Sequence, residues 1–170
     1  MSIAARIAQD WNQYSYPELE CDAFSLPYYL EYHSKIEDLY NKLPLKAKKI
    51  LNGATLYLCN SDTLSKVTGQ DRIIGLSRPG KRGVFYNIEK FVQQNEGFDE
   101  NRFVNLFFHE IGHYLVHNFT EREIEYYAKR FGTTPTTPGE PEADGFAAYM
   151  TGVAPYHIQE FWAWWILNNS

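Results

Sequence analysis

The chain has 170 residues, a length that one hydrophobic core can organise, so we expect a single domain over residues 1–170. Hydrophobic residues make up 44% and charged residues 22% of the chain, which excludes an intrinsically disordered protein. The formal net charge of −5 argues against a nucleic-acid-binding protein, because phosphate binding requires a basic surface. The one tight basic cluster, Lys46, Lys48 and Lys49, is typical of a solvated helix face.

The cysteines and the apolar runs indicate the compartment. Cys21 and Cys59 have neither the spacing of a CxxC motif nor the density of a disulfide framework, so we expect reduced thiols. Residues 1–10 lack the apolar core of a signal peptide, and no run approaches the roughly 18 apolar residues of a membrane span. We therefore expect a cytoplasmic protein that makes no contact with a membrane.

The first third of the chain is predicted to be helical. Residues 2–13 are compatible with a short helix, and a loop rich in proline and aromatic residues follows at 14–27. Residues 28–43 carry apolar side chains near helical spacing. Pro44 ends that helix and opens another over residues 45–52.

The middle of the chain changes to strand patterns. Strands are predicted at residues 54–59, 73–76 and 84–88, and turn residues fill positions 78–83. The strand at 84–88 directly precedes the next helical segment. We expect it to be a sheet edge along which an extended peptide substrate can pair.

Helical patterns return after these strands. Asp99 is a predicted N-cap for a helix whose body is residues 102–119. Thr120 and Glu123 have the spacing of a capping box in front of a helix at 124–131.

Glycine and proline divide the remaining segment. Gly132 ends the preceding helix, residues 133–139 form a loop, and Pro141 opens a helix through residue 150. Pro155 opens a last helix, whose aromatic residues are too dense for a solvated surface. These residues are Phe161, Trp162, Trp164 and Trp165.

Together these elements predict an α+β protein. We expect a small three-stranded or larger mixed sheet packed on the helix at 102–119. No repeat or linker divides the chain, which we describe as a helical N-terminal part (1–52), a core (53–151) and a C-terminal helix (152–170).

The run His109-Glu110-Ile111-Gly112-His113 carries the chemistry of the chain. Its two histidines are four residues apart on one predicted helix, so both rings project from the same face and can bind one zinc ion. Glu110 is placed to take a proton from a water on that zinc, whose charge lowers the pKa of water toward roughly 7. The helix is apolar around most of its circumference, and burying these polar groups is costly unless a partner such as a metal binds them.

A catalytic zinc usually has three protein ligands, so a third ligand is needed. His117 lies about 12 Å along the helix axis from His109, too far for one ion to bind both on a regular helix. The histidine that metzincins place ten residues after the first ligand is replaced by Phe119, which excludes that class.

Two glutamates remain as candidates for the third ligand. Glu140 and Asp144 have an i,i+4 spacing that lets the first bind zinc while the second accepts the ring N–H of a liganding histidine. Glu142 is the alternative ligand, because Pro141 can place Glu140 before the helix proper.

The motif at residues 109–117 and the segment at 140–150, Glu-Pro-Glu-Ala-Asp-Gly-Phe-Ala-Ala-Tyr-Met, resemble the ImmA/IrrE-type zinc metallopeptidases among the gluzincins. The similarity covers about residues 84–150. It implies a zincin-like fold, an acidic third ligand from a downstream helix, and intracellular cleavage of a protein, in the better-known cases a transcriptional repressor. The chain departs from the family's usual Leu-Leu-Met-Pro, since Tyr149-Met150-Thr151-Gly152 stands there.

We therefore expect a zinc-dependent endopeptidase in which His109, His113 and Glu140 bind Zn²⁺ and Glu110 activates the zinc-bound water that attacks a protein or peptide substrate. The candidate donors to the oxyanion are Tyr126, Tyr127, Tyr149, Tyr156 and His157. The alternative is a non-catalytic protein that uses zinc as a structural clip and binds a partner through the aromatic C-terminal helix. Glu110 favours the enzyme, because a structural site needs no base there.

Overall fold

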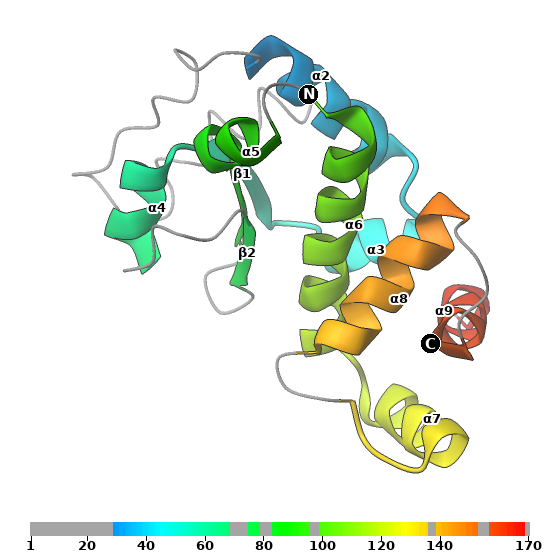
Figure 1. The fold of residues 1–170 in the computed structure, drawn as a ribbon. Helices are drawn as coiled ribbons and strands as arrows, with labels where there is room; N and C mark the ends of the chain where they lie inside the picture. The colour runs from blue at the N-terminus through cyan, green and yellow to red at the C-terminus, as the bar shows by residue number, and fades with distance from the viewer. Residues whose placement is uncertain are drawn as a thin grey trace. The chain divides into compact units, whose positions relative to one another are not determined.

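The computed structural model describes residues 29–68, 75–78, 83–95, 99–135, 139–152 and 157–168 (Figure 1). The predicted helix at 2–13, the loop at 14–27, and also Cys21, Pro155 and Tyr156 lie outside the described residues. The contacts divide the chain into two compact units, each described by itself below: Met1–Lys42 with Gly53–Phe103, and Leu43–Asn52 with Val104–Ser170. The expected single domain and its three parts stay predictions.

The first unit contains a three-stranded mixed sheet, so the predicted α+β class is confirmed. Its elements are α2 (Tyr29–Asn41), β1 (Thr55–Cys59), α4 (Ser61–Thr68), β2 (Gly75–Arg78), β3 (Gly83–Asn87), α5 (Ile88–Asn95) and the first turn of α6 (Glu100–His117). The strand order is β1-β3-β2, with β1 parallel and β2 antiparallel to β3. The packing of the sheet on the HExxH residues stays a prediction.

The strand at 84–88 is central, so its prediction as a substrate-pairing edge is wrong. Strand β3 pairs with β1 from Thr55↔Gly83 to Cys59↔Asn87, and with β2 from Gly75↔Tyr86 to Arg78↔Gly83. Both of its hydrogen-bonding sides are therefore occupied. The crossover through α4 returns the chain beside β1, and this long-range pairing leaves no signature in the strand's own sequence.

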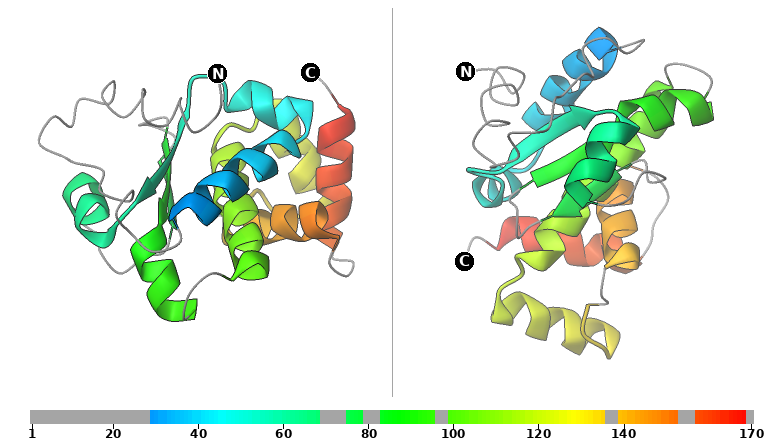
Figure 2. Two further views of the ribbon diagram at one scale, coloured as in Figure 1. Left: turned by 90° about the horizontal axis from the view of Figure 1, so that it is seen from above. Right: turned by 90° about the vertical axis from the view of Figure 1, so that its left-hand side faces the viewer.

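Both faces of the parallel pair are covered, and every residue of β1 and β3 is buried. On one face Tyr57 stacks on Phe85 at a centroid distance of 4.7 Å, beside Leu64 of α4. On the other face Tyr86 contacts Phe103 at 6.0 Å, and Phe103 contacts Tyr32 of α2 at 4.7 Å. Figure 2 shows α4 and α2 on opposite sides of the sheet. The helices α4 and α5, which the sequence analysis missed, directly follow β1 and β3.

The second unit is helical in the described residues, and one of its helices, α7, begins with the expected capping box. It contains α3 (Leu45–Ile50), the remainder of α6, α7 (Glu121–Phe131), α8 (Glu140–Thr151) and α9 (His157–Leu167). Glu123 N donates to Thr120 Oγ1 and Thr120 N donates to Glu123 Oε1, which confirms the capping box. Gly132 ends α7 with φ 77°. In the part of the chain that the structure covers, no helix combines the length and apolarity that crossing a membrane requires.

The aromatic residues of α9 form the core of the second unit. Phe161, Trp162 and Trp165 are fully buried. Phe119, just after α6, packs on Phe161 and Trp162 at centroid distances of 5.3 and 5.6 Å. Trp164 is half-buried and stacks on Tyr126 of α7 at 3.6 Å. All four aromatic residues that suggested a partner-binding helix therefore pack within the unit, three of them fully buried and Trp164 half-buried.

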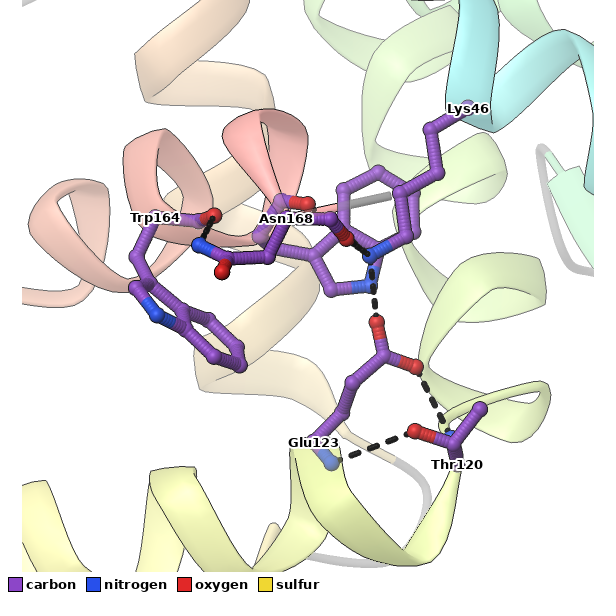
Figure 3. Close-up of polar contacts among 6 residues, drawn as sticks. Lys46, Thr120, Glu123, Trp164 and Asn168 are labelled. Carbon is purple, nitrogen blue, oxygen red and sulfur yellow. Dashed lines mark hydrogen bonds and ion pairs between the residues drawn. The ribbon is translucent and has the colours of Figure 1, made fainter. Parts of the chain in front are cut away.

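Lys46 is largely buried, so its prediction as part of a solvated face is wrong. Its side chain is 10% exposed, and Nζ donates to Glu123 Oε2 at 2.7 Å and to the carbonyls of Trp165 and Asn168 at 2.9 and 2.7 Å (Figure 3). The ammonium also lies 4.4 Å from the centre of the Trp165 ring. The last carbonyls of a helix have no intrahelical donor and attract a cation, so Lys46 joins α3 to the end of α9 and to α7.

We predict that Lys46→Met destabilises the protein by about 3 to 5 kcal/mol, because the substitution leaves the buried Glu123 carboxylate without its cationic partner. Urea unfolding measures the loss, and Lys49→Met, an exposed lysine on the same helix, is the control with little expected effect. The double variant Lys46→Met/Glu123→Gln should recover part of the stability. A loss no larger for Lys46→Met than for Lys49→Met would contradict this account.

Candidate metal centre

Two glycines allow α8 to lie unusually close to its neighbours. A Cβ atom at Gly112 of α6 would lie 2.9 Å from Ala143 Cα and 3.2 Å from the Ala143 carbonyl oxygen. A Cβ atom at Gly145 would lie 2.3 Å from Cγ2 of Ile158 in α9. Figure 1 shows α8 crossing beside α6. This close approach brings the first turn of α8 next to the histidines of α6.

Three of the predicted site residues come together at this crossing. His109 Nε2 and His113 Nε2 lie 3.1 Å apart, as the i,i+4 spacing predicts. The Glu140 carboxylate faces both rings, with Oε1 2.9 Å from His113 Nε2 and Oε2 3.2 Å from His109 Nε2. These donor atoms all lie within 4.8 Å of one another. His117 is exposed at the end of α6.

The separations of the donor atoms fit a small cation. Zinc binds histidine nitrogen at 2.0–2.1 Å, so two ligands of a tetrahedral site are about 3.3 Å apart. The observed separations between donor atoms, 2.9 to 3.2 Å, are slightly shorter than this value. They also permit hydrogen bonds from the rings to the carboxylate, so distance alone does not identify a metal site.

Both ring nitrogens of His109 face carboxylate oxygens. Asp144 Oδ1 lies 2.8 Å from Nδ1 and Glu140 Oε2 lies 3.2 Å from Nε2. A neutral imidazole has an N–H on only one of its two nitrogens. The lone pair of the other nitrogen would therefore face a carboxylate oxygen and be repelled by it. Either a protonated ring or a cation between Nε2 and Glu140 removes this repulsion. A cation in that place would also meet Nε2 of His113, which faces the same carboxylate.

Asp144 lies where the sequence analysis expected a carboxylate beside a liganding histidine. Its oxygen is within hydrogen-bond distance of His109 Nδ1, although the N–H does not point at it in this rotamer. The Asp144 side chain is 71% exposed and can rotate to improve the angle. A carboxylate at this nitrogen fixes the tautomer that leaves Nε2 unprotonated for a metal.

Glu142, the alternative third ligand, points elsewhere. Its side chain is fully buried and accepts a hydrogen bond from the Tyr127 hydroxyl at 2.6 Å. The Trp162 indole N–H donates to the Glu142 backbone carbonyl at 2.9 Å. Burial and the bond to Glu142 raise the pKa of Tyr127. Of the two candidates for the third ligand, Glu140 is therefore the one beside the histidines. The hydroxyl of Tyr127, which was a candidate oxyanion donor, is hydrogen-bonded to Glu142 instead.

Glu110 is a buried carboxylate near this group. It is 6% exposed, and Oε2 has no hydrogen-bond partner among the residues that the structure describes. Burial raises its pKa to about 8, and the Glu140 carboxylate contributes to this increase. Glu110 is therefore within electrostatic range of the group that faces the histidines. A divalent cation at that group would act in the opposite direction and favour the ionised carboxylate.

The sequence analysis did not identify Gly112 or Tyr127 as structurally important for the site. Glycine inside a helix costs about 1 kcal/mol relative to alanine, so Gly112 in an otherwise apolar helix is a recognisable signal of close packing. Tyr127 gives no such signal, because its partner Glu142 is fifteen residues away on another helix.

We predict that Gly112→Ala destabilises the protein by about 1 to 3 kcal/mol and weakens metal binding, because the new methyl group forces α6 and α8 apart. The control is Asn105→Ala at an exposed position of α6. Ala143→Gly should not rescue the variant, since the clash involves Cα and the carbonyl oxygen of that residue. Urea unfolding and zinc titration measure both effects, and a Gly112→Ala protein more stable than the natural chain would contradict the prediction.

Comparison of the chain with protein-family models, with curated proteins and with solved structures finds no match in any of the three. The interpretation of this centre rests on its own donor atoms. Two imidazole nitrogens and a carboxylate converge, and a second carboxylate is buried beside them.

Proposed function

We propose that the protein is a zinc-dependent endopeptidase in which His109, His113 and Glu140 bind the metal and Glu110 is the general base. The observation that carries this proposal is the convergence of the three donor atoms beside a buried carboxylate that has no hydrogen-bond partner for Oε2. A zincin-like fold, membership of the ImmA/IrrE-type group, a cytoplasmic location and a protein or peptide substrate belong to the same proposal.

In this proposal each residue of the site has a separate role in peptide hydrolysis. Bound zinc supplies a Lewis acid that polarises the substrate carbonyl and lowers the pKa of water toward roughly 7. Glu110 accepts the proton of the attacking water at its carboxylate and returns it to the nitrogen of the leaving amine. The unpartnered Oε2 is an acceptor suited to this transfer, because nothing else in the described residues competes for it. Asp144 orients the His109 ring.

The alternative function, a structural zinc clip in a binding protein, is less well supported. A clip has no use for Glu110. A buried carboxylate oxygen without a hydrogen bond lowers stability, and a catalytic role would explain why this cost is tolerated. The aromatic residues that motivated a partner-binding helix are largely committed to the core of the second unit.

Glu110→Gln tests the catalytic role directly. We expect the natural protein to contain stoichiometric zinc and to cleave denatured casein. The variant should retain zinc while its cleavage rate falls by about 10² to 10⁴, because a glutamine cannot accept the proton. Glu125→Gln, an exposed glutamate of α7, is the matched control and should cleave normally. Zinc without cleavage in the natural protein, across a broad peptide library, would support the clip.

Paired substitutions distinguish the two acidic candidates for the third ligand. Glu140→Gln should weaken zinc binding strongly, because it removes the charged donor atom, while Glu142→Gln should retain zinc. Competition with a chromophoric chelator measures both dissociation constants. The reverse ranking would show that Glu142, and not Glu140, binds the metal.

A further inference from the structure

The first turn of α8 carries Glu140 but has no side-chain cap of its own. Its N-cap is Gly139, with φ 86°, which offers no side-chain oxygen to the exposed N–H groups of the helix. Glu140 is 59% exposed, and its ion-pair contacts are with the two histidines of the site. An exposed carboxylate of this kind is positioned mainly by the backbone that carries it. The orientation of this turn must therefore be fixed by something else.

Glu142 supplies that fixation from the other side of the same turn. Successive residues of a helix are 100° apart, so side chains two positions apart point in nearly opposite directions. Glu140 faces the histidines, and Glu142 is buried with its carboxylate 2.6 Å from the Tyr127 hydroxyl of α7. The Trp162 indole of α9 donates to the Glu142 carbonyl at 2.9 Å. The turn is thus bound by its side chain and by its backbone, to two different helices.

We propose that Tyr127 and Glu142 are positioning residues for the metal centre, acting through the first turn of α8 on Glu140. This inference rests on the proposed function. A metal ligand must be held within about 0.5 Å and 10–20° of its working geometry, and rotation of α8 about its axis would move Glu140 by more than this. The buried Tyr127–Glu142 hydrogen bond opposes that rotation, and Gly112 fixes the distance between the helices.

A purely structural role for the pair would affect only stability. In that case Tyr127→Phe would lower the free energy of unfolding and leave the metal site unchanged once folded. A positioning role changes the affinity and the coordination geometry of the folded protein. The test must therefore measure metal binding separately from folding, and it must compare variants of similar stability.

The experiment measures Zn²⁺ dissociation constants by chelator competition and the visible spectrum of the Co²⁺-substituted full-length protein. We expect Tyr127→Phe to weaken zinc binding by about 10- to 100-fold and to change the Co²⁺ spectrum. Tyr126→Phe, the neighbouring tyrosine that stacks on Trp164, should do neither. Ile36→Val, at a buried position of α2 in the first unit, lowers stability and should bind zinc as the natural chain does. Glu142→Gln keeps an acceptor for the Tyr127 hydroxyl, so it should weaken zinc binding less than Tyr127→Phe does.

If Tyr127→Phe fails to fold, the double variant Tyr127→Phe/Glu142→Leu replaces both polar partners with apolar groups and should fold. The positioning role would be overturned if this folded double variant bound zinc as tightly as the natural chain. It would also be overturned if Tyr127→Phe alone left the zinc affinity and the Co²⁺ spectrum unchanged. Failure of the natural protein to bind zinc would overturn the proposed function itself. The two failures are therefore separate observations.

Discussion

The close approach of α6 and α8 at Gly112 is the constraint on which the candidate centre depends. The two histidines of α6 are brought together by helical spacing alone, but the third donor comes from a helix that starts 27 positions after His113 in the sequence. That helix reaches the histidines because no side chain separates Gly112 from the backbone of Ala143. The glycine that HExxH leaves unspecified is thus as important to the geometry as the specified residues.

The second unit holds α8 by contacts of different kinds. Gly112 and Gly145 set how near α6 and α9 lie, while Tyr127 and Trp162 bind the first turn. Lys46 does not touch α8 but ties α3 and α7 to the end of α9. The contacts of Tyr127 and Trp162 are buried and those of Lys46 are partly buried. Away from water a hydrogen bond is stronger and an unpaired group more costly. Rigid surroundings of this kind suit a site whose ligands must converge within a few tenths of an ångström.

Local signals in the sequence predicted much of the fold. The capping box at Thr120 and Glu123, the N-cap at Asp99 and the helix-ending Gly132 are confirmed, because each depends on residues within one turn. The three strands were found within a few residues of their observed bounds. The helices α4 and α5 were missed, since each has only eight residues and follows a strand almost directly.

What the sequence did not reveal depends on long-range contacts. The central place of β3, the burial of Lys46 and the partner of Glu142 involve residues 15 to 122 positions apart. The choice between Glu140 and Glu142 could not be made from spacing, because both lie in an acidic first turn. Helical geometry points the two side chains in nearly opposite directions, but the packing of α7 and α9 around that turn decides which of them faces the histidines. The sequence motif and the helix propensities were therefore enough to locate the candidate site. Which glutamate faces the histidines depends on tertiary packing.

The central claim is that His109, His113 and Glu140 form a zinc site. X-ray absorption at the zinc edge of the protein as purified tests it most directly, because the spectrum reports the ligand atoms themselves. The account predicts two imidazole nitrogens and oxygen ligands at about 2.0 to 2.2 Å, with no sulfur. A zinc-free protein that fails to bind added zinc, or a site with thiolate ligands, would contradict it.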